Sequence, residues 1–391
     1  MVKVLDLFSG IGGFSLGFHD ALDAWEMGKP SWTGFSDIDK FANEQYKKRF
    51  PDAEQLGDVK SIRYGSIPND ITILFGGFPC QAFSMAGRRK GFMDTRGTLF
   101  FEIARILRDF IDNKNPIPCF LLENVKGLLS HDNGRTFATI HRVLTDLDYT
   151  VECQVVNTKW FLPQNRERIF IFGRYLGNPS GRKVFPIGES GKESNNRNTE
   201  VANCLQHPGH SGGNYRGMTM VKVGNLYKVK SVAQRTRNYK GEDSKIEERD
   251  DDVSNALNSQ PKDYMVKIPE ATKQGYAIAE EGDSINLSVP DSKTRRGRIG
   301  KGVAQTLDTG MQQYTIAKSR IRRLTPVECE RLQGFPYGWT EGQSDTQRYK
   351  QLGNAVSVPV IEAICMNIIR IHMKDLRKKM GAFLTEKERN G

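Results

Sequence analysis

The sequence contains no continuous apolar run near the roughly twenty residues that a membrane-spanning helix requires. Residues 1–6 read as the start of a strand and lack the apolar core of a signal peptide. The six cysteines are scattered without a Cys-x-x-Cys pair, which argues against a disulfide framework and against a zinc ribbon. We therefore expect a soluble, cytoplasmic protein that needs neither a membrane nor a metal.

Positive charge is in excess. The 391 residues include 57 Lys and Arg against 46 Asp and Glu, a formal net charge of +11. This excess of positive charge suits a polyanionic partner such as a nucleic acid. Many basic proteins bind no nucleic acid, so the net charge alone does not identify the partner. The length allows two or three domains, each with a hydrophobic core.

Residues 1–175 alternate short β-rich runs with helical patterns. Residues 14–24 predict a helix, and apolar residues between Leu99 and Ile111 recur at the spacing of a buried helix face. Strands that alternate with helices favour an α/β fold with a mostly parallel, doubly wound, Rossmann-like sheet. The predicted strands are 2–8, 32–36, 71–75, 120–122, 151–156 and 169–172.

Residues 178–318 are rich in Gly, Ser, Asn, Lys and Arg and predict a smaller, loop-rich β domain. A weak Val-x-x-x-Leu repeat begins at Val201, Val253 and Val303, with a period of about fifty residues that is typical of repeated units. Regular structure returns at Thr325, which predicts a helix N-cap with a capping box.

The turn after the first strand allows a ligand to approach the backbone closely. Gly10 and Gly12 follow Phe8, and Asp37 follows the second strand, where a carboxylate can bind a ribose hydroxyl pair. Ser15 stands where a dinucleotide-binding motif has its third glycine, so a nucleoside without phosphates fits better. A tight strand–helix turn without a ligand is the alternative.

Cys80 and Glu123 each follow a predicted strand, Cys80 on a Gly-Gly-Phe-Pro loop. On neighbouring strand ends, a thiolate and a carboxyl group can attack one ring atom and protonate another. Most lone cysteines are small buried apolar residues, but the glycines and proline around Cys80 do not build a core. Arg166 and Arg168, at the start of another strand, can bind a carbonyl oxygen and a phosphate, or simply form an alternating charged surface.

Together, these segments resemble the DNA (cytosine-5) methyltransferases. The matching motifs keep the family's order and cover nearly all of residues 1–175 and 320–372, while the region between them matches only as a variable target-recognition domain. The motifs are residues 6–14, 37, 57–59, 76–84, 94–97, 123–125, 164–168, 323–336 and 351–356.

The resemblance implies S-adenosylmethionine as methyl donor, S-adenosylhomocysteine as product, and a flipped-out cytosine in double-stranded DNA as acceptor. Cys80 would bond to C6 of the base while Glu123 donates a proton to N3. Arg168 would hold the base oxygen, with Arg166 in support. No residue of the motifs is assigned to remove the C5 proton, and bound water is the candidate acceptor.

The resemblance also implies a cofactor site. Asp37 would hold the ribose, Asp58 would accept from the adenine amino group, and Phe8 would stack on adenine. Ile38 stands where the family often has a larger residue, so adenine packing would be looser. The expected cofactor set is Phe8, Gly10, Ile11, Gly12, Gly13, Asp37, Ile38, Asp58, Val59, Gly77, Pro79, Asn354 and Ala355. The expected DNA contacts are Gln81, Ser84, Arg96 and Thr306.

Five parts are expected: a catalytic and cofactor-binding domain, a target-recognition domain, a return segment, a C-terminal helix and a charged tail. Their boundaries are 1–177, 178–318, 319–355, 356–374 and 375–391.

Three alternative functions make different demands on the sequence. An RNA (tRNA) cytosine-5 methyltransferase would have a shorter insertion, and a non-catalytic DNA-binding relative would lack Cys80, Glu123 or the glycine loop. Identification as a nicotinamide-dependent dehydrogenase would explain only the first glycine turn and none of the later motifs.

We expect the protein to be a monomer. A restriction endonuclease that acts on the same DNA site is a candidate partner, and both a bacterial and a phage-encoded enzyme are open alternatives.

Overall fold

The computed structural model describes ten stretches of the chain, and contacts within the chain divide it into two units. Cys80, Gln81, Ser84 and Arg96 lie outside the described residues, as do the first two copies of the Val-x-x-x-Leu repeat and the charged tail. The described residues are 2–79, 99–176, 183–188, 230–235, 245–248, 265–289, 292, 294–310, 312–317 and 320–371. Unit 1 comprises Met1–Asn157, Glu167–Ser194 and Ala355–Gly391, and unit 2 comprises Thr158–Arg166 and Asn195–Asn354.

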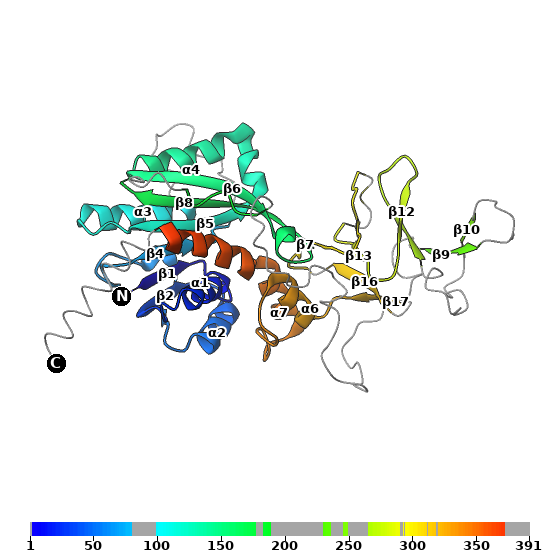
Figure 1. The fold of residues 1–391 in the computed structure, drawn as a ribbon, viewed down its shortest axis with the longest axis horizontal. Coiled ribbons are helices and arrows are strands. Elements are labelled where there is room, and N and C mark those ends of the chain that lie inside the picture. The colour runs from blue at the N-terminus through cyan, green and yellow to red at the C-terminus, as the bar shows by residue number, and fades with distance from the viewer. Residues whose placement is uncertain are drawn as a thin grey trace. The chain divides into compact units, whose positions relative to one another are not determined.

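Unit 1 is built on a seven-stranded sheet of order β3-β2-β1-β4-β5-β8-β6 (Figure 1). The first five strands in this order are parallel, and β8 runs antiparallel to both β5 and β6. The predicted mostly parallel, Rossmann-like α/β sheet is therefore confirmed. The strands are β1 (Lys3–Leu7), β2 (Trp32–Ser36), β3 (Glu54–Gln55), β4 (Ile73–Gly76), β5 (Cys119–Val125), β6 (Tyr149–Asn157) and β8 (Glu167–Tyr175).

The helices of unit 1 start at residues suited to a helix N-terminus. Gly12, in the left-handed region at φ 86°, precedes α1, and Asp39 caps α2 by accepting two backbone N–H groups. The helices are α1 (Gly13–Ala24), α2 (Lys40–Arg49), α3 (Leu99–Asp112), α4 (Arg135–Thr145) and a C-terminal helix over 358–371. Short 3₁₀ turns are η1 (Val59–Ser61), η4 (Lys126–Leu129), η5 (His131–Gly134) and, in unit 2, η6 (Thr158–Trp160).

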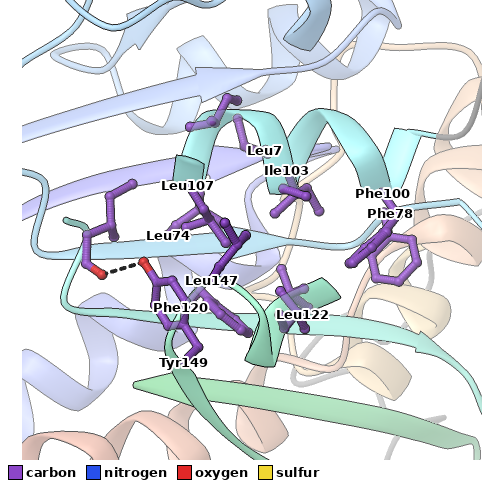
Figure 2. Close-up of a cluster of buried hydrophobic side chains, with 14 of the residues drawn as sticks. Leu7, Leu74, Phe78, Phe100, Ile103, Leu107, Phe120, Leu122, Leu147 and Tyr149 are labelled. Carbon is purple, nitrogen blue, oxygen red and sulfur yellow. Dashed lines mark hydrogen bonds between the residues drawn. The ribbon is translucent and has the colours of Figure 1, made fainter. Parts of the chain in front are cut away.

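The main core of unit 1 lies between the sheet and α3. Leu74 and Phe120 of the sheet pack near Ile103 and Leu107, which carry the predicted apolar face of α3 (Figure 2). Burial of such side chains contributes about 1.5–3 kcal/mol each. Phe78 joins this core beside Phe100, their ring centroids 5.6 Å apart, and so anchors the loop that follows β4.

Among its described residues, unit 2 contains two four-stranded antiparallel sheets, one pair of parallel strands and two α-helices. A four-stranded sheet has the order β10-β9-β11-β12, a second has β14-β13-β16-β17, and β15 pairs with β7. The strands are β7 (Gln164–Asn165), β9 (Lys230–Arg235), β10 (Lys245–Glu248), β11 (Met265–Pro269), β12 (Tyr276–Ala279), β13 (Ser284–Asn286), β14 (Ile299–Gly300), β15 (Ala304–Gln305), β16 (Gln313–Ala317) and β17 (Arg320–Arg323).

The helices of unit 2 are α6 (Pro326–Gln333) and α7 (Asp345–Asn354). Thr325 and Glu328 form the predicted capping box, and Gly334 ends α6 in the left-handed conformation. Within the described residues, one helical stretch, Asp345–Ile371, is long and apolar enough to cross a membrane by length and composition alone. Its most apolar window is 67% buried inside the protein, and the helix is interrupted at residues 355–357.

Replacing Gly173 by alanine should destabilise unit 1. Gly173 on β8 lies opposite Phe120 on β5, and an added Cβ would lie 2.1 Å from the Phe120 ring. Overpacking of this kind costs about 1–3 kcal/mol, so the urea midpoint of Gly173→Ala should fall clearly. The control is Gly127→Ala, whose added Cβ meets only a Val125 methyl group at 4.0 Å. Equal midpoints for the two variants would contradict this packing.

Candidate active site

The loop after β1 has a strained backbone that is tied to the loop after β2. Phe8, Gly10 and Gly12 have φ values of 55°, 53° and 86°, and only glycine adopts this region without cost. The Gly10 N–H donates to Asp37 Oδ2 at 2.9 Å, and the Asp39 N–H donates to Asp37 Oδ1 at 2.8 Å. The Asp37 carboxylate therefore fixes the two loops at the carboxyl ends of β1 and β2.

The two glycines of this loop serve different purposes. An added Cβ at Gly10 would meet nothing within 4 Å, whereas one at Gly12 would lie 2.6 Å from the Phe50 ring. Gly10 therefore borders open space, while Gly12 is required by packing. Ile11 is 1% exposed and Val59 is 3% exposed, so these two predicted cofactor residues can offer a ligand only their backbone.

The groups around Gly10 suit a nucleoside. Phe8 is half-buried, and the apolar Ile38 side chain is 82% exposed. Asp58 is exposed and accepts the Lys60 N–H at 3.0 Å as the N-cap of η1. Apolar surface and carboxylate acceptors are the features needed to bind an aromatic base and ribose hydroxyls.

A buried polar cluster underlies this loop, and sequence reasoning missed it. Asp6 on β1 is fully buried, and its Oδ2 accepts hydrogen bonds from Ser15 Oγ at 2.8 Å and Tyr46 OH at 3.2 Å. The two hydroxyl oxygens lie 2.6 Å apart. Burial raises the pKa of Asp6 from 3.8 to about 7.

Glu123 lies near the end of β5 beside the loop that follows β4. Its side chain is largely buried, and Arg168 Nε lies 3.1 Å from Glu123 Oε1 in the geometry of an ion pair. The other oxygen, Oε2, would lie 3.8 Å from a Cβ added at Gly77. The two oxygens therefore have different neighbours, a guanidinium and a glycine loop. Arg168 Nη1 also donates to the Glu167 carbonyl at 2.9 Å.

Asn124, which sequence reasoning did not single out, holds the same loop. Its Nδ2 donates to the Phe78 carbonyl at 2.9 Å, and its Oδ1 accepts the Val125 N–H at 2.8 Å. The residue is 2% exposed. Asn124 thus fixes the backbone just before the exposed Pro79, which precedes Cys80 in the sequence.

The remaining predicted residues of the described chain lie mainly in unit 2. Arg166 is buried, and its Nη1 donates to the Gly353 carbonyl at 3.4 Å, next to the exposed Asn354. Thr306 directly follows β15, and its Oγ1 donates to the Asn165 carbonyl at 2.8 Å. This hydrogen bond adds to the pairing of β15 with β7. Ala355 begins the last part of unit 1 and is buried.

Comparison with known proteins assigns the chain to a family. Residues 2–370 match the C-5 cytosine-specific DNA methylases. The chain belongs to this family. It is therefore a DNA cytosine-5 methyltransferase, as the sequence motifs predicted.

Curated relatives match over almost the whole chain. The type II methyltransferase M1.ScrFI of Lactococcus lactis subsp. cremoris is 37% identical over 94% of this chain and 78% of its own length. M.SsoII of Shigella sonnei is 38% identical over 94% of this chain and 80% of its length. The orphan methyltransferase M.SPRI of Bacillus phage SPR is 28% identical over 95% of this chain and 98% of its length.

Solved structures show the same fold at lower identity. The methyltransferase EhMeth of Entamoeba histolytica has a TM-score of 0.57 at 17% identity, covering 96% of this chain and 99% of its own. A putative DNA modification methyltransferase from an Escherichia coli prophage has a TM-score of 0.56 at 20% identity, covering 95% and 99%.

Removing the Asn124 side chain should impair both stability and methylation. Asn124→Ala leaves the Phe78 carbonyl without its donor, at a cost of about 1–3 kcal/mol, and frees the loop that leads to Cys80. The unfolding midpoint and the methyl-transfer rate should both fall. Asn113→Ala is the control, because Asn113 makes its hydrogen bond at the exposed end of α3. A methylation rate unchanged in Asn124→Ala would refute the role of this hydrogen bond in holding the loop.

Proposed function

We propose that the methyltransferase acts on a flipped-out cytosine within a short duplex sequence, with Cys80 as nucleophile and Glu123 as acid. The observation that carries the proposal is the placement of Glu123. Its buried carboxyl group sits beside Gly77, three residues before Cys80, and is ion-paired with Arg168. A base must leave the stack before a thiol can reach its ring carbons.

Cys80, as its thiolate, would form a bond to C6 of the cytosine as Glu123 donates a proton to N3. This addition places electron density on C5, which becomes nucleophilic. Bound S-adenosylmethionine supplies an electrophilic methyl group for C5. Transfer of the C5 proton to a bound water molecule then restores the C5–C6 double bond and expels Cys80 as a thiolate, and return of the N3 proton to Glu123 regenerates the acid.

The contacts of Glu123 suggest separate roles for its two oxygens. Arg168 Nε holds Oε1 at 3.1 Å, so Oε2, on the side of Gly77, is the oxygen we assign to the base N3. Arg168 would orient the carboxyl group from one side and present its remaining N–H groups to the base O2. Arg166 would act at a distance from the base, by supporting the Gly353 backbone next to Asn354.

The open glycine loop supports S-adenosylmethionine as the donor. Asp37 would bind the ribose, Asp58 the adenine amino group, and Phe8 and Ile38 the faces of adenine. Ile38 is exposed enough for such a contact. Gly77 and Pro79 would border the same site, and Asn354 is assigned to it by family resemblance alone.

Double-stranded DNA is the proposed partner, and the net charge of +11 suits it. Thr306 would contact the DNA backbone while it holds β7 through Asn165. The curated relatives are named type II methyltransferases, which supports a role beside a restriction endonuclease that recognises the same site. We also propose a cytoplasmic location in a bacterium. A phage relative makes a solitary, phage-borne enzyme the second candidate.

A duplex that carries 5-fluorocytosine at the target site should trap the covalent intermediate. Fluorine cannot leave C5 as a proton does, so wild type should give an SDS-resistant protein–DNA adduct. Cys80→Ser should give none, whereas Cys153→Ser should match wild type because Cys153 is an exposed residue of β6. An adduct that survives in Cys80→Ser would disprove the assigned nucleophile.

Glu123→Gln should slow methyl transfer by about 10²–10⁴-fold, because the amide cannot donate the acid proton to N3.

A further inference from the structure

Asp6 is a buried carboxyl group that the proposed reaction does not use. It lies on β1, two residues before Phe8, with no exposed surface. Its register partners on the adjacent parallel strands are Phe35 and Phe75, which bring no polar group to it. A buried carboxyl group is costly unless it is paired or neutral, so its presence at this position requires a reason.

The donors to Asp6 come from the two helices that follow the cofactor loops. Ser15 Oγ on α1 and Tyr46 OH on α2 both reach Oδ2, at 2.8 Å and 3.2 Å. Among the residues that the structure describes, the buried Oδ1 has no hydrogen-bond partner. The charged group that acts on Asp6 from the neighbouring loop is Asp37, another acid. No cation therefore neutralises Asp6 within the described part of its surroundings.

This cluster is coupled to the glycine loop by direct packing. The Tyr46 ring lies 3.2 Å from the position of a Cβ at Gly12, and it stacks on Phe35 with centroids 4.0 Å apart. Ser15 lies in the first turn of α1, which begins at Gly13, directly after Gly12. Asp37 holds the other side of the loop through the Gly10 N–H. The Asp6 carboxyl group thus lies under the loop to which the methyl donor is assigned.

The donor and the product of the reaction differ by one methyl group and one positive charge. Adenine, ribose and the amino-acid portion are common to both, so contacts to those parts cannot discriminate between them. A negative charge in a dry environment does discriminate, because Coulomb interactions there are far less screened than in water. We propose that Asp6 is a positioning residue whose buried negative charge favours the sulfonium donor S-adenosylmethionine over the neutral product S-adenosylhomocysteine. The inference rests on the proposed use of this donor.

The protonation of Asp6 makes the proposal measurable. Burial, with the nearby Asp37 charge as a smaller contribution, raises the pKa of Asp6 to about 7, while the Ser15 and Tyr46 hydroxyls oppose this shift. A cation bound nearby stabilises the carboxylate and lowers its pKa, so donor binding near neutral pH releases a proton. The product carries the same ammonium group but lacks the sulfonium charge, so its binding releases fewer protons from Asp6 than donor binding does. Preference for the donor should therefore rise as the pH increases through 7.

The experiment is calorimetric titration of the full-length protein with each ligand at pH 6, 7, 8 and 9. At each pH it is run in two buffers of different ionisation enthalpy, which gives the number of protons released. At pH 7 donor binding should release up to about half a proton more than product binding, and the difference should vanish at pH 9. The affinity ratio of donor to product should rise by about tenfold between pH 6 and pH 8.

Three variants separate charge from structure. Asp6→Asn keeps the size of the side chain but has no charge, so the extra proton release and the pH dependence of the ratio should both disappear. Ser15→Ala and Tyr46→Phe each remove a donor to the carboxylate, so the rise in the ratio should move to higher pH. These two variants test the proposal independently if Asp6→Asn does not fold, as judged by its thermal unfolding.

The possible failures are distinguishable. If wild type binds neither ligand, the proposed use of S-adenosylmethionine is wrong. If both ligands bind with equal proton release and a ratio that does not change with pH, only the role of Asp6 is wrong. An Asp6→Asn variant that weakens both ligands equally would show a purely structural role and would also overturn the inference.

Discussion

The parallel pairing of β1, β4 and β5 is the constraint on which the candidate site in unit 1 depends. Leu7, Gly76 and Leu122 are aligned across the three strands, so the chain leaves each strand at the same edge of the sheet. The glycine loop, the Gly77 loop and Glu123 all follow from this alignment. Because the backbone hydrogen bonds of the sheet fix this alignment, candidate catalytic groups that are far apart in sequence reach the same edge of the sheet.

Much of this arrangement could be predicted from the sequence, because it is encoded in local patterns. All six predicted strands form, and the strand over Trp32–Ser36 has the predicted ends. The helix α3 and the capping box at Thr325 also form as expected. Helix α2 was not predicted, because its buried residues include only Ala42 and Tyr46 as apolar side chains. Its formation depends on the Asp39 cap and on packing against Phe35.

Contacts between distant segments could not be predicted in this way. Asn124 reads in the sequence as part of a family motif, and only the fold shows its amide at the Phe78 carbonyl. Asp6 likewise reads as the last part of a strand, and its two hydroxyl donors come from helices 9 and 40 residues further along the chain. For the predicted cofactor residues Ile11 and Val59, the sequence motif suggested a contact that their side chains cannot make. Position in a motif identified them, but the fold places their side chains in the interior.

The division of the chain has a consequence for recombination between related genes. Unit 2 includes Thr158–Arg166, a short segment inserted between β6 and β8 of unit 1. Its strand β7 pairs with β15, Gln164 beside Ala304, and Thr306 bonds to Asn165. A recombination event that replaced only residues 195–354 would leave half of this two-stranded sheet behind. Viable chimaeras must therefore inherit a strand β15 compatible with the resident β7, which limits which segments equivalent to residues 195–354 can be exchanged between genes.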